Sequence, residues 1–354
     1  MVGAKHPPMK PGMIDAPHER WAAGDLRLES GEVIHDFELS YVTHGTPSAA
    51  KDNVVLVTVS LTGNHHRLDF LIGPGKALDT DRYFVIAVDP IGNGLTSSPS
   101  NSQRQPGMQF PRFCLRDMVG SQHRLLTEAL GIESVHAVVG ASMGGMQALQ
   151  WAVSHPDFVR SIVAMTPMAR TGPWAVAVVE TARRALMADP AWDGEAFTAY
   201  PERGWRAWSG VMSALANRTP AALAETFENP LDVLPWMDKL TADNLANGFD
   251  ATDWLYQSWA YQAHDVGTTP GVPGGTEGAL ASIRSSTLIL APPLDLFNPV
   301  QCAHEAADAI PGAILVEIPS LQGHQSASSL REEEVAFLDD EIGAFIRAVR
   351  AGPD

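Results

Sequence analysis

A serine flanked by glycines occupies the centre of HAVVGASMGGMQALQW, residues 136–151. The five residues GASMG fit the pattern G-x-S-x-G; they follow an apolar run typical of a buried strand and lead into helix-favouring residues. A sharp turn there presents the Ser142 hydroxyl above a sheet edge, and Gly140 and Gly144 leave room for neighbouring backbone. The free N–H groups of the helix N-terminus suit a site where an oxyanion forms. We therefore predict a nucleophile at Ser142; the alternative is a glycine-rich connection with an incidental serine.

Two later residues can supply the acid and the base that a serine nucleophile needs. Asp295 follows the apolar run STLILAPPL, and His324 follows AILVEIPSLQG, so both lie at the carboxyl ends of expected strands. Their order after Ser142 is the order in which this kind of nucleophile takes its partners. The rival His304 lies in PVQCAHEAADAI, which indicates a helix covering the sheet, so we expect a surface or packing role for it. A turn role for Asp295 and a loop role for His324 are the alternatives.

The loop LTGNHH, after the early apolar run NVVLVTVS, is the expected source of a second oxyanion donor. We predict that the backbone N–H of Leu61 acts together with that of Met143. The same loop holds an adjacent pair, His65 and His66. Neighbouring positions rarely aim both rings at one ion without a third ligand nearby, so we expect the rim of a pocket here and no metal. The segment IGPGK at 72–76 lacks the remaining spacing of a phosphate loop.

The pattern of strands and helices predicts how these residues are held. From about residue 25, β-branched runs alternate with helical segments, which predicts a mostly parallel sheet covered on both faces. Over residues 170–284 the strand signals stop and the sequence becomes helical, before strand signals return. We therefore predict an α/β-hydrolase fold with a core of residues 1–169 and 285–354 and an inserted helical lid over 170–284. Seven of the nine tryptophans lie in the predicted lid: Trp174, Trp192, Trp205, Trp208, Trp236, Trp254 and Trp259.

Composition excludes several classes of partner. The 354 residues are 45% hydrophobic, which is enough for a large core. The formal net charge is −17 and the 24 basic residues form no dense run, so nucleic acid and anionic membranes are poor partners. Cys114 and Cys302 allow at most one disulfide and show no metal-ligand spacing. The N-terminal stretch lacks the apolar segment of a signal peptide, so we expect a cytoplasmic protein.

Six segments of the chain resemble the homoserine O-acetyltransferases, an α/β-hydrolase family with a helical lid and usually a dimeric state. They are LTGNHH, LIGPGKALDTDRYFVIAVD, FPRFCLRDMVGSQHRLL, VVGASMGGMQALQWAVSHPD, DLFNP and GHQ, and the resemblance runs from about residue 25 to the C-terminus. It implies Ser142, Asp295 and His324 as the catalytic triad. It also implies a small-molecule ester substrate, no cofactor and a homodimer formed through the lid.

The sequence departs from those acetyltransferases at positions expected to meet the acyl acceptor. Where they carry an aspartate after the catalytic histidine, this chain has Gln325. Where their lid carries the arginine that meets the homoserine carboxylate, the best register places Ser209, with Arg206 and Arg218 nearby in the sequence. Each charge-assisted hydrogen bond contributes about 1.5–3 kcal/mol, so losing two removes much of the recognition of homoserine.

These departures resemble an ester-hydrolase branch of the same family. The tryptophan, alanine and methionine of the lid suit an apolar or neutral alcohol group, and we expect Gln325 and Trp208 to contact substrate, with lid packing as the alternative role for a single tryptophan. We therefore predict a serine esterase that cleaves short-chain, acetyl-type esters through an acyl-enzyme. The alternatives are an O-acyltransferase that uses acetyl-CoA with homoserine or another alcohol, and a catalytically inactive dimeric scaffold.

Overall fold

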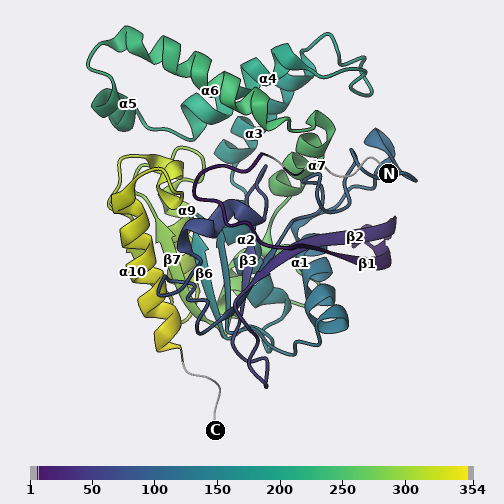
Figure 1. Cartoon of the computed structure of the whole chain (residues 1–354), viewed down its shortest axis with the longest axis vertical. Coiled ribbons are helices and arrows are strands. Elements are labelled where there is room, and N and C mark those ends of the chain that lie inside the picture. The colour runs from purple at the N-terminus through teal and green to yellow at the C-terminus, as the bar shows by residue number, and fades with distance from the viewer. Residues whose placement is uncertain (1–5, 7, 350–354) are drawn as a thin grey trace.

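An eight-stranded sheet forms the centre of the computed structural model, which describes residue 6 and residues 8–349 (Figure 1). The strands are β1 His18–Arg27, β2 Val33–His44, β3 Val54–Thr58, β4 Phe84–Val88, β5 Ala137–Ala141, β6 Ser161–Met165, β7 Ser286–Ala291 and β8 Ile314–Glu317. They lie in the order β1-β2-β4-β3-β5-β6-β7-β8. The pairs β1–β2 and β2–β4 are antiparallel and the other five are parallel, which confirms the mostly parallel sheet.

The described residues also form ten α-helices, some of which cover the two faces of this sheet. They are α1 Leu115–Arg124, α2 Met143–Ser154, α3 Pro173–Met187, α4 Glu202–Ser209, α5 Pro220–Thr226, α6 Val233–Asn247, α7 Ala251–Gln262, α8 Gly275–Ala281, α9 Val300–Ala309 and α10 Glu332–Ala348. Short 3-10 helices add to them, including one at His65–Leu71 after β3. Helices α1 and α2 pack in the hydrophobic core on one face, and α10 packs in the core on the other.

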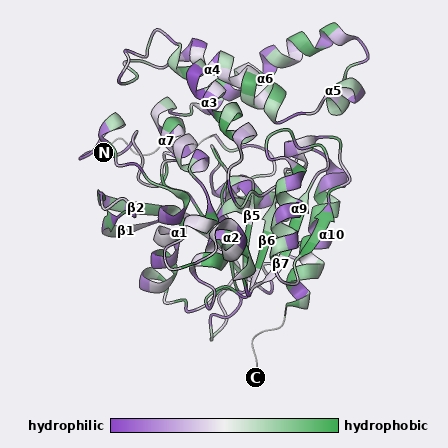
Figure 2. Cartoon of the chain, turned by 180° about the vertical axis from the view of Figure 1, so that it is seen from behind, coloured by the Kyte–Doolittle hydropathy of each residue, from purple (hydrophilic) through white to green (hydrophobic). Residues whose placement is uncertain are grey.

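The continuous apolar sequences of β3, β5 and β6 follow from burial of these strands on both faces. Side chains alternate between the faces, so Leu56 of β3 joins one core and its neighbours Val55 and Val57 join the other. Figure 2 shows hydrophobic residues along β6 and β7 between the helices. The sheet is therefore a rigid base whose carboxyl edge carries the functional loops.

Helices and their connecting loops form the segment between β6 and β7, which contains isolated bridges but none of the sheet strands. In Figure 1, α4, α5 and α6 lie as a layer above the carboxyl ends of the strands. Tryptophan side chains connect α4 to α7. The ring of Trp208 makes edge contacts with those of Trp205, also on α4, and Trp254, on α7, at centroid distances of 5.0 and 5.8 Å. All three side chains are buried, so aromatic packing joins α4 to α7.

The structure contains a strand that the sequence pattern did not indicate. β1 begins at His18, before the expected start of the sheet near residue 25, and pairs with β2 through register shifts around Gly24. Most of its residues are exposed, so this edge strand lacks the apolar alternation that reveals a strand in a sequence. No helix among the described residues is long and apolar enough to cross a membrane. Cys114 and Cys302 are both free thiols.

Candidate active site

The backbone at Ser142 is held in an unusual conformation between β5 and α2. Its φ and ψ are 57° and −123°, a region that costs a residue with a Cβ about 1–3 kcal/mol. The Ser142 N–H donates to the carbonyl of Met165 at 2.9 Å and to Oγ1 of Thr166 at 3.1 Å, both at the end of neighbouring β6. These bonds fix the sharp turn between strand and helix that the G-x-S-x-G pattern predicted.

The two glycines of the pattern allow the backbone around this turn to pack closely. A Cβ on Gly140 would lie 2.3 Å from the carbonyl of Gly144, and one on Gly144 would lie 2.3 Å from the carbonyl oxygen of Thr58. Thr58, the last residue of β3, also donates from Oγ1 to the carbonyl of Gly144 at 2.8 Å. Helix α2 therefore starts directly against the end of β3, where a larger residue at either glycine has no space.

Ser142, His324 and Asp295 form a continuous hydrogen-bonded chain across three loops. His324 Nε2 lies 2.8 Å from Ser142 Oγ, and His324 Nδ1 lies 2.7 Å from Oδ2 of Asp295. The other carboxylate oxygen, Oδ1, accepts from the backbone N–H groups of Phe297 and Asn298 at 2.8 and 2.9 Å. With the carboxylate as acceptor, Nδ1 carries the ring proton and Nε2 is free to take the hydroxyl proton of Ser142.

Residues that the sequence did not single out support the imidazole and the carboxylate. The Phe297 ring packs against the His324 ring at 4.9 Å and 70°, and Tyr261 stacks on Phe297. Asn298 donates from Nδ2 to the carbonyl of Thr166 at 2.7 Å and also bonds the Tyr261 hydroxyl. The only sequence signal was the turn-forming DLFNP, in which Asp295 caps its own loop.

A cavity of about 470 Å³ opens onto Ser142 and His324. The predicted contact residues Leu61, Trp208 and Gln325 all line it. Met143, the first residue of α2, is buried next to Ser142 and is not among the cavity-lining residues of the described chain. The structure thus brings together the residues that the sequence assigned to one site.

The charged side chains that line this cavity among the described residues are all basic or histidine. Arg67 donates from Nε to Ser60 Oγ at 3.0 Å and from Nη2 to the carbonyl of Ala327 at 2.7 Å, and burial lowers its pKa to about 10. Lys10 donates to Asn247 Oδ1 at 2.7 Å. No aspartate or glutamate of the described chain lines the cavity, and a neutral amide, Gln325, follows His324.

Ser209, Arg206 and Arg218, the residues at or near the position of the acetyltransferase arginine, lie apart from this lining. Ser209 is buried and its Oγ accepts from Asn244. Arg206 is exposed and pairs with Glu202 at 2.8 Å. Arg218 borders a different groove. None of the three is among the cavity-lining residues of the described chain.

The other histidines considered in the sequence, His304 and the pair His65 and His66, have different surroundings. His304 lies exposed on α9 and pairs with Glu317 at 3.3 Å. His66 lines the cavity, as expected for a pocket rim, whereas His65 is buried. A third histidine, His6, which the sequence did not single out, lies against both rings.

A family model described as the alpha/beta hydrolase fold matches residues 56–263, more than half of the chain. The chain belongs to the α/β-hydrolase family. This confirms the fold predicted from the nucleophile turn and the strand pattern, and an enzyme of this family is the coarse functional assignment that the comparison supports.

The relatives of this chain include proteins named as esterases and proteins named as acetyltransferases. A probable esterase of Corynebacterium glutamicum is 32% identical over 93% of this chain and 95% of its own length. The homoserine O-acetyltransferase of Methanosalsum zhilinae is 33% identical over 78% of this chain, which spans only 62% of that relative. A crystal structure of an acetylester hydrolase from Corynebacterium glutamicum superimposes with a TM-score of 0.86 at 29% identity, covering 94% of this chain and 96% of that one. The resemblance to the homoserine O-acetyltransferase family and its esterase branch is thus confirmed.

Proposed function

We propose that this α/β hydrolase is a serine esterase that cleaves short-chain, acetyl-type esters. Ser142 Oγ attacks the acyl carbonyl while His324 Nε2 takes the hydroxyl proton, and Asp295 stabilises the imidazolium that forms. His324 then protonates the departing alcohol, which leaves an acyl group on Ser142. Water, deprotonated by His324, releases the acid. The hydrogen-bonded chain from Ser142 to Asp295 at the floor of the cavity is the observation that carries this proposal.

The oxyanion is held by the backbone N–H groups of Leu61 and Met143 in this mechanism. Met143 opens α2, so its N–H has no acceptor within the helix. The loop of Leu61 is tied down on both sides: Ser60 Oγ donates to the carbonyl of Ala141 at 2.7 Å, and the Thr62 N–H donates to Oε1 of Gln257 at 3.2 Å. A donor fixed before the reaction costs no reorganisation when the negative charge develops.

The charges of the cavity favour hydrolysis over transfer to homoserine. Homoserine carries an ammonium and a carboxylate, and a buried ammonium needs an acidic partner to offset its desolvation. The described lining offers none, since Gln325 follows His324 and Asp295 is buried behind that ring. Water needs no such partner.

The upper wall of the cavity suits a neutral ester. Trp208 of α4 and Trp254 of α7 line it. The apolar parts of an ester can contact these aromatic rings. Residues 170–284, which supply both tryptophans, act as a lid in this proposal.

Acetyl transfer to an alcohol is the second candidate, and Arg67 favours it. This guanidinium at the cavity can meet the carboxylate of an amino-acid acceptor even though the lid supplies no arginine. The relative from Methanosalsum zhilinae, a homoserine O-acetyltransferase, adds weight to this alternative.

Steady-state kinetics distinguish the two functions. The wild type is assayed with 4-nitrophenyl acetate alone and, separately, with acetyl-CoA plus homoserine, and Ser142→Ala is assayed beside it. We expect a higher kcat/KM for the ester and a loss on the order of 10⁴-fold or more in Ser142→Ala. Efficient transfer from acetyl-CoA to homoserine by the wild type refutes the esterase assignment, and activity of Ser142→Ala within tenfold of wild type refutes the serine mechanism.

A further inference from the structure

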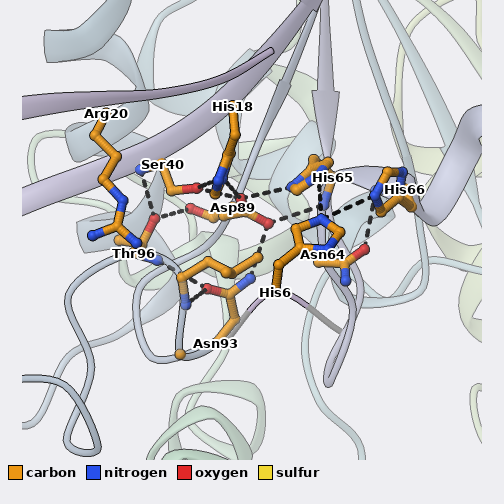
Figure 3. A network of polar contacts seen from close by, with 12 residues as sticks. His6, His18, Arg20, Ser40, Asn64, His65, His66, Asp89, Asn93 and Thr96 are labelled. Carbon is orange, nitrogen blue, oxygen red and sulfur yellow. Dashed lines mark hydrogen bonds and ion pairs between the residues drawn. The ribbon is translucent and has the colours of Figure 1, made fainter. Parts of the chain in front are cut away.

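Three histidine side chains from distant parts of the chain converge beside the cavity. His6 Nε2 lies 3.2 Å from Nε2 of His65 and 3.1 Å from Nε2 of His66 (Figure 3). One nitrogen from each ring lies within 4.8 Å of the others. His6 comes from the N-terminal segment, whereas His65 and His66 begin the 3-10 helix after β3.

A carboxylate sets the protonation of His66. Its Nδ1 lies 2.7 Å from Oδ2 of Asp69, and the same oxygen accepts the backbone N–H of Ile14 at 2.7 Å. Because this oxygen is already an acceptor, His66 Nδ1 is the donor. A neutral imidazole with its proton on Nδ1 presents a lone pair at Nε2, which is the atom that faces His6.

A second carboxylate, that of Asp89, determines which nitrogen of His65 carries the proton. The Nδ1 of His65 lies 2.9 Å from Oδ2 of Asp89, whose other oxygen accepts the His65 N–H at 2.9 Å and Asn93 Nδ2 at 3.0 Å. Oδ2 also accepts from the hydroxyl of Ser40 at 2.5 Å. Because this oxygen is already an acceptor, His65 donates through Nδ1 and presents its Nε2 lone pair to His6.

Protons alone cannot give good hydrogen bonds at both short contacts, the one between His6 and His65 and the one between His6 and His66. The His6 Nε2 atom carries either one hydrogen or one lone pair, so it can point at only one of the two facing lone pairs. A cation bound between the three nitrogens accepts all three lone pairs as ligands. We propose that His6, His65 and His66 bind a divalent transition-metal ion, with Zn²⁺ as the best fit, through their Nε2 atoms.

The geometry and the surroundings fit this metal. Zn–N bonds of about 2.0–2.1 Å at tetrahedral angles place ligand nitrogens about 3.3 Å apart, close to the spacings of 3.1 and 3.2 Å. Neutral imidazole suits zinc, and metal-bound histidines usually donate their other ring N–H to a carboxylate. Asp69 and Asp89 fill that outer role, which leaves the fourth position for water.

The metal clamps the N-terminal segment onto the loop that leads from Leu61 to the 3-10 helix. His66 and Lys10 line the cavity, so the joined segments form part of its wall. The ion takes no part in ester cleavage, because Ser142, His324 and Asp295 already supply the nucleophile, the base and the acid. Its binding is therefore measurable independently of activity.

Metal binding by tag-free protein tests this site. Chelator-treated wild type is titrated with Zn²⁺ by calorimetry, and its metal content is measured after gel filtration. We expect one Zn²⁺ per chain and a rise in Tm on binding. Co²⁺ in its place is expected to give the visible spectrum of a four-coordinate ion.

Three variants locate the site. His6→Ala removes a ligand from the segment before β1 and leaves the buried strands unchanged, so it is expected to fold and to lose stoichiometric uptake and the Tm rise. Asp69→Asn keeps an oxygen but removes the charge behind His66, and we expect about 10–100-fold weaker binding. His304→Gln, an exposed histidine on α9, is the matched control and retains full binding. No uptake by the wild type, or equal uptake by wild type and His6→Ala, overturns the proposal.

Discussion

Asp295→Asn is expected to abolish the base function of His324 without disturbing the fold. The side-chain oxygen Oδ1 accepts two backbone N–H groups, from Phe297 and Asn298. These donors hold the oxygen of an asparagine amide in the same place, so its NH₂ group faces His324 Nδ1. An NH₂ group can only donate, so the ring proton moves to Nε2. That nitrogen then donates toward Ser142 instead of accepting its proton.

The expected loss follows from this change of tautomer. A wrongly protonated histidine in a Ser-His-Asp arrangement lowers kcat by about 10⁴-fold, which corresponds to about 5.5 kcal/mol of transition-state stabilisation. The assay is hydrolysis of 4-nitrophenyl acetate over a range of concentrations up to saturation, so that kcat and KM are determined separately. We expect the loss in kcat, because the cavity that binds the ester is unchanged.

Asp265→Asn provides the matched control. Asp265 also caps its own loop, through Oδ1 accepting from the Gly267 N–H at 2.7 Å and from Thr276 Oγ1 at 2.9 Å, but it does not line the cavity. The two variants are expected to have similar Tm values, and only Asp295→Asn is expected to lose activity. A kcat for Asp295→Asn within tenfold of wild type refutes the argument from the tautomer.

Three further predictions concern the acyl group, the acceptor and acid stability. Among 4-nitrophenyl acetate, butyrate, octanoate and palmitate, we expect the fastest turnover with acetate or butyrate, because the proposed substrates are short-chain esters. A maximum at octanoate or beyond contradicts the proposed preference for short acyl groups. Gln325→Asp places a carboxylate beside His324 and should increase the ratio of O-acetylhomoserine to free acetate formed from an acetyl ester with added homoserine; an unchanged ratio shows that Gln325 does not select the acceptor. Burial lowers the pKa of His264 from 6.5 to about 4, so its stabilising contribution is complete above pH 6.5 and is lost as the pH falls toward 4, by up to about 3 kcal/mol. The drop in Tm between pH 7 and pH 4.5 should be smaller in His264→Gln than in the wild type, and an equal drop removes His264 as a cause.

The sequence by itself determined the features that depend on local order along the chain. Continuous apolar runs of strand length predicted β3, β5, β6 and β7, because a strand buried on both faces needs apolar residues throughout. The turn at Ser142 was readable because glycines are required within two residues on either side of it. Asp295 and His324 were identifiable because each follows an expected strand, and parallel strands end at the same edge of the sheet.

Only the tertiary structure decided the features that join distant residues. The contact of Ser142 with His324 spans 182 positions, so the distance of 2.8 Å is a property of the folded sheet. The sequence left open whether Arg206 or Arg218 could reach the substrate, and packing of the helical layer places both outside the described cavity lining. His6 meets His65 across 59 positions because the exposed strand β1 and the segment before it lie against the loop after β3. Adjacent histidines carry no signal of a distant third partner, since side-chain convergence depends on how the backbone folds back and not on spacing in the chain.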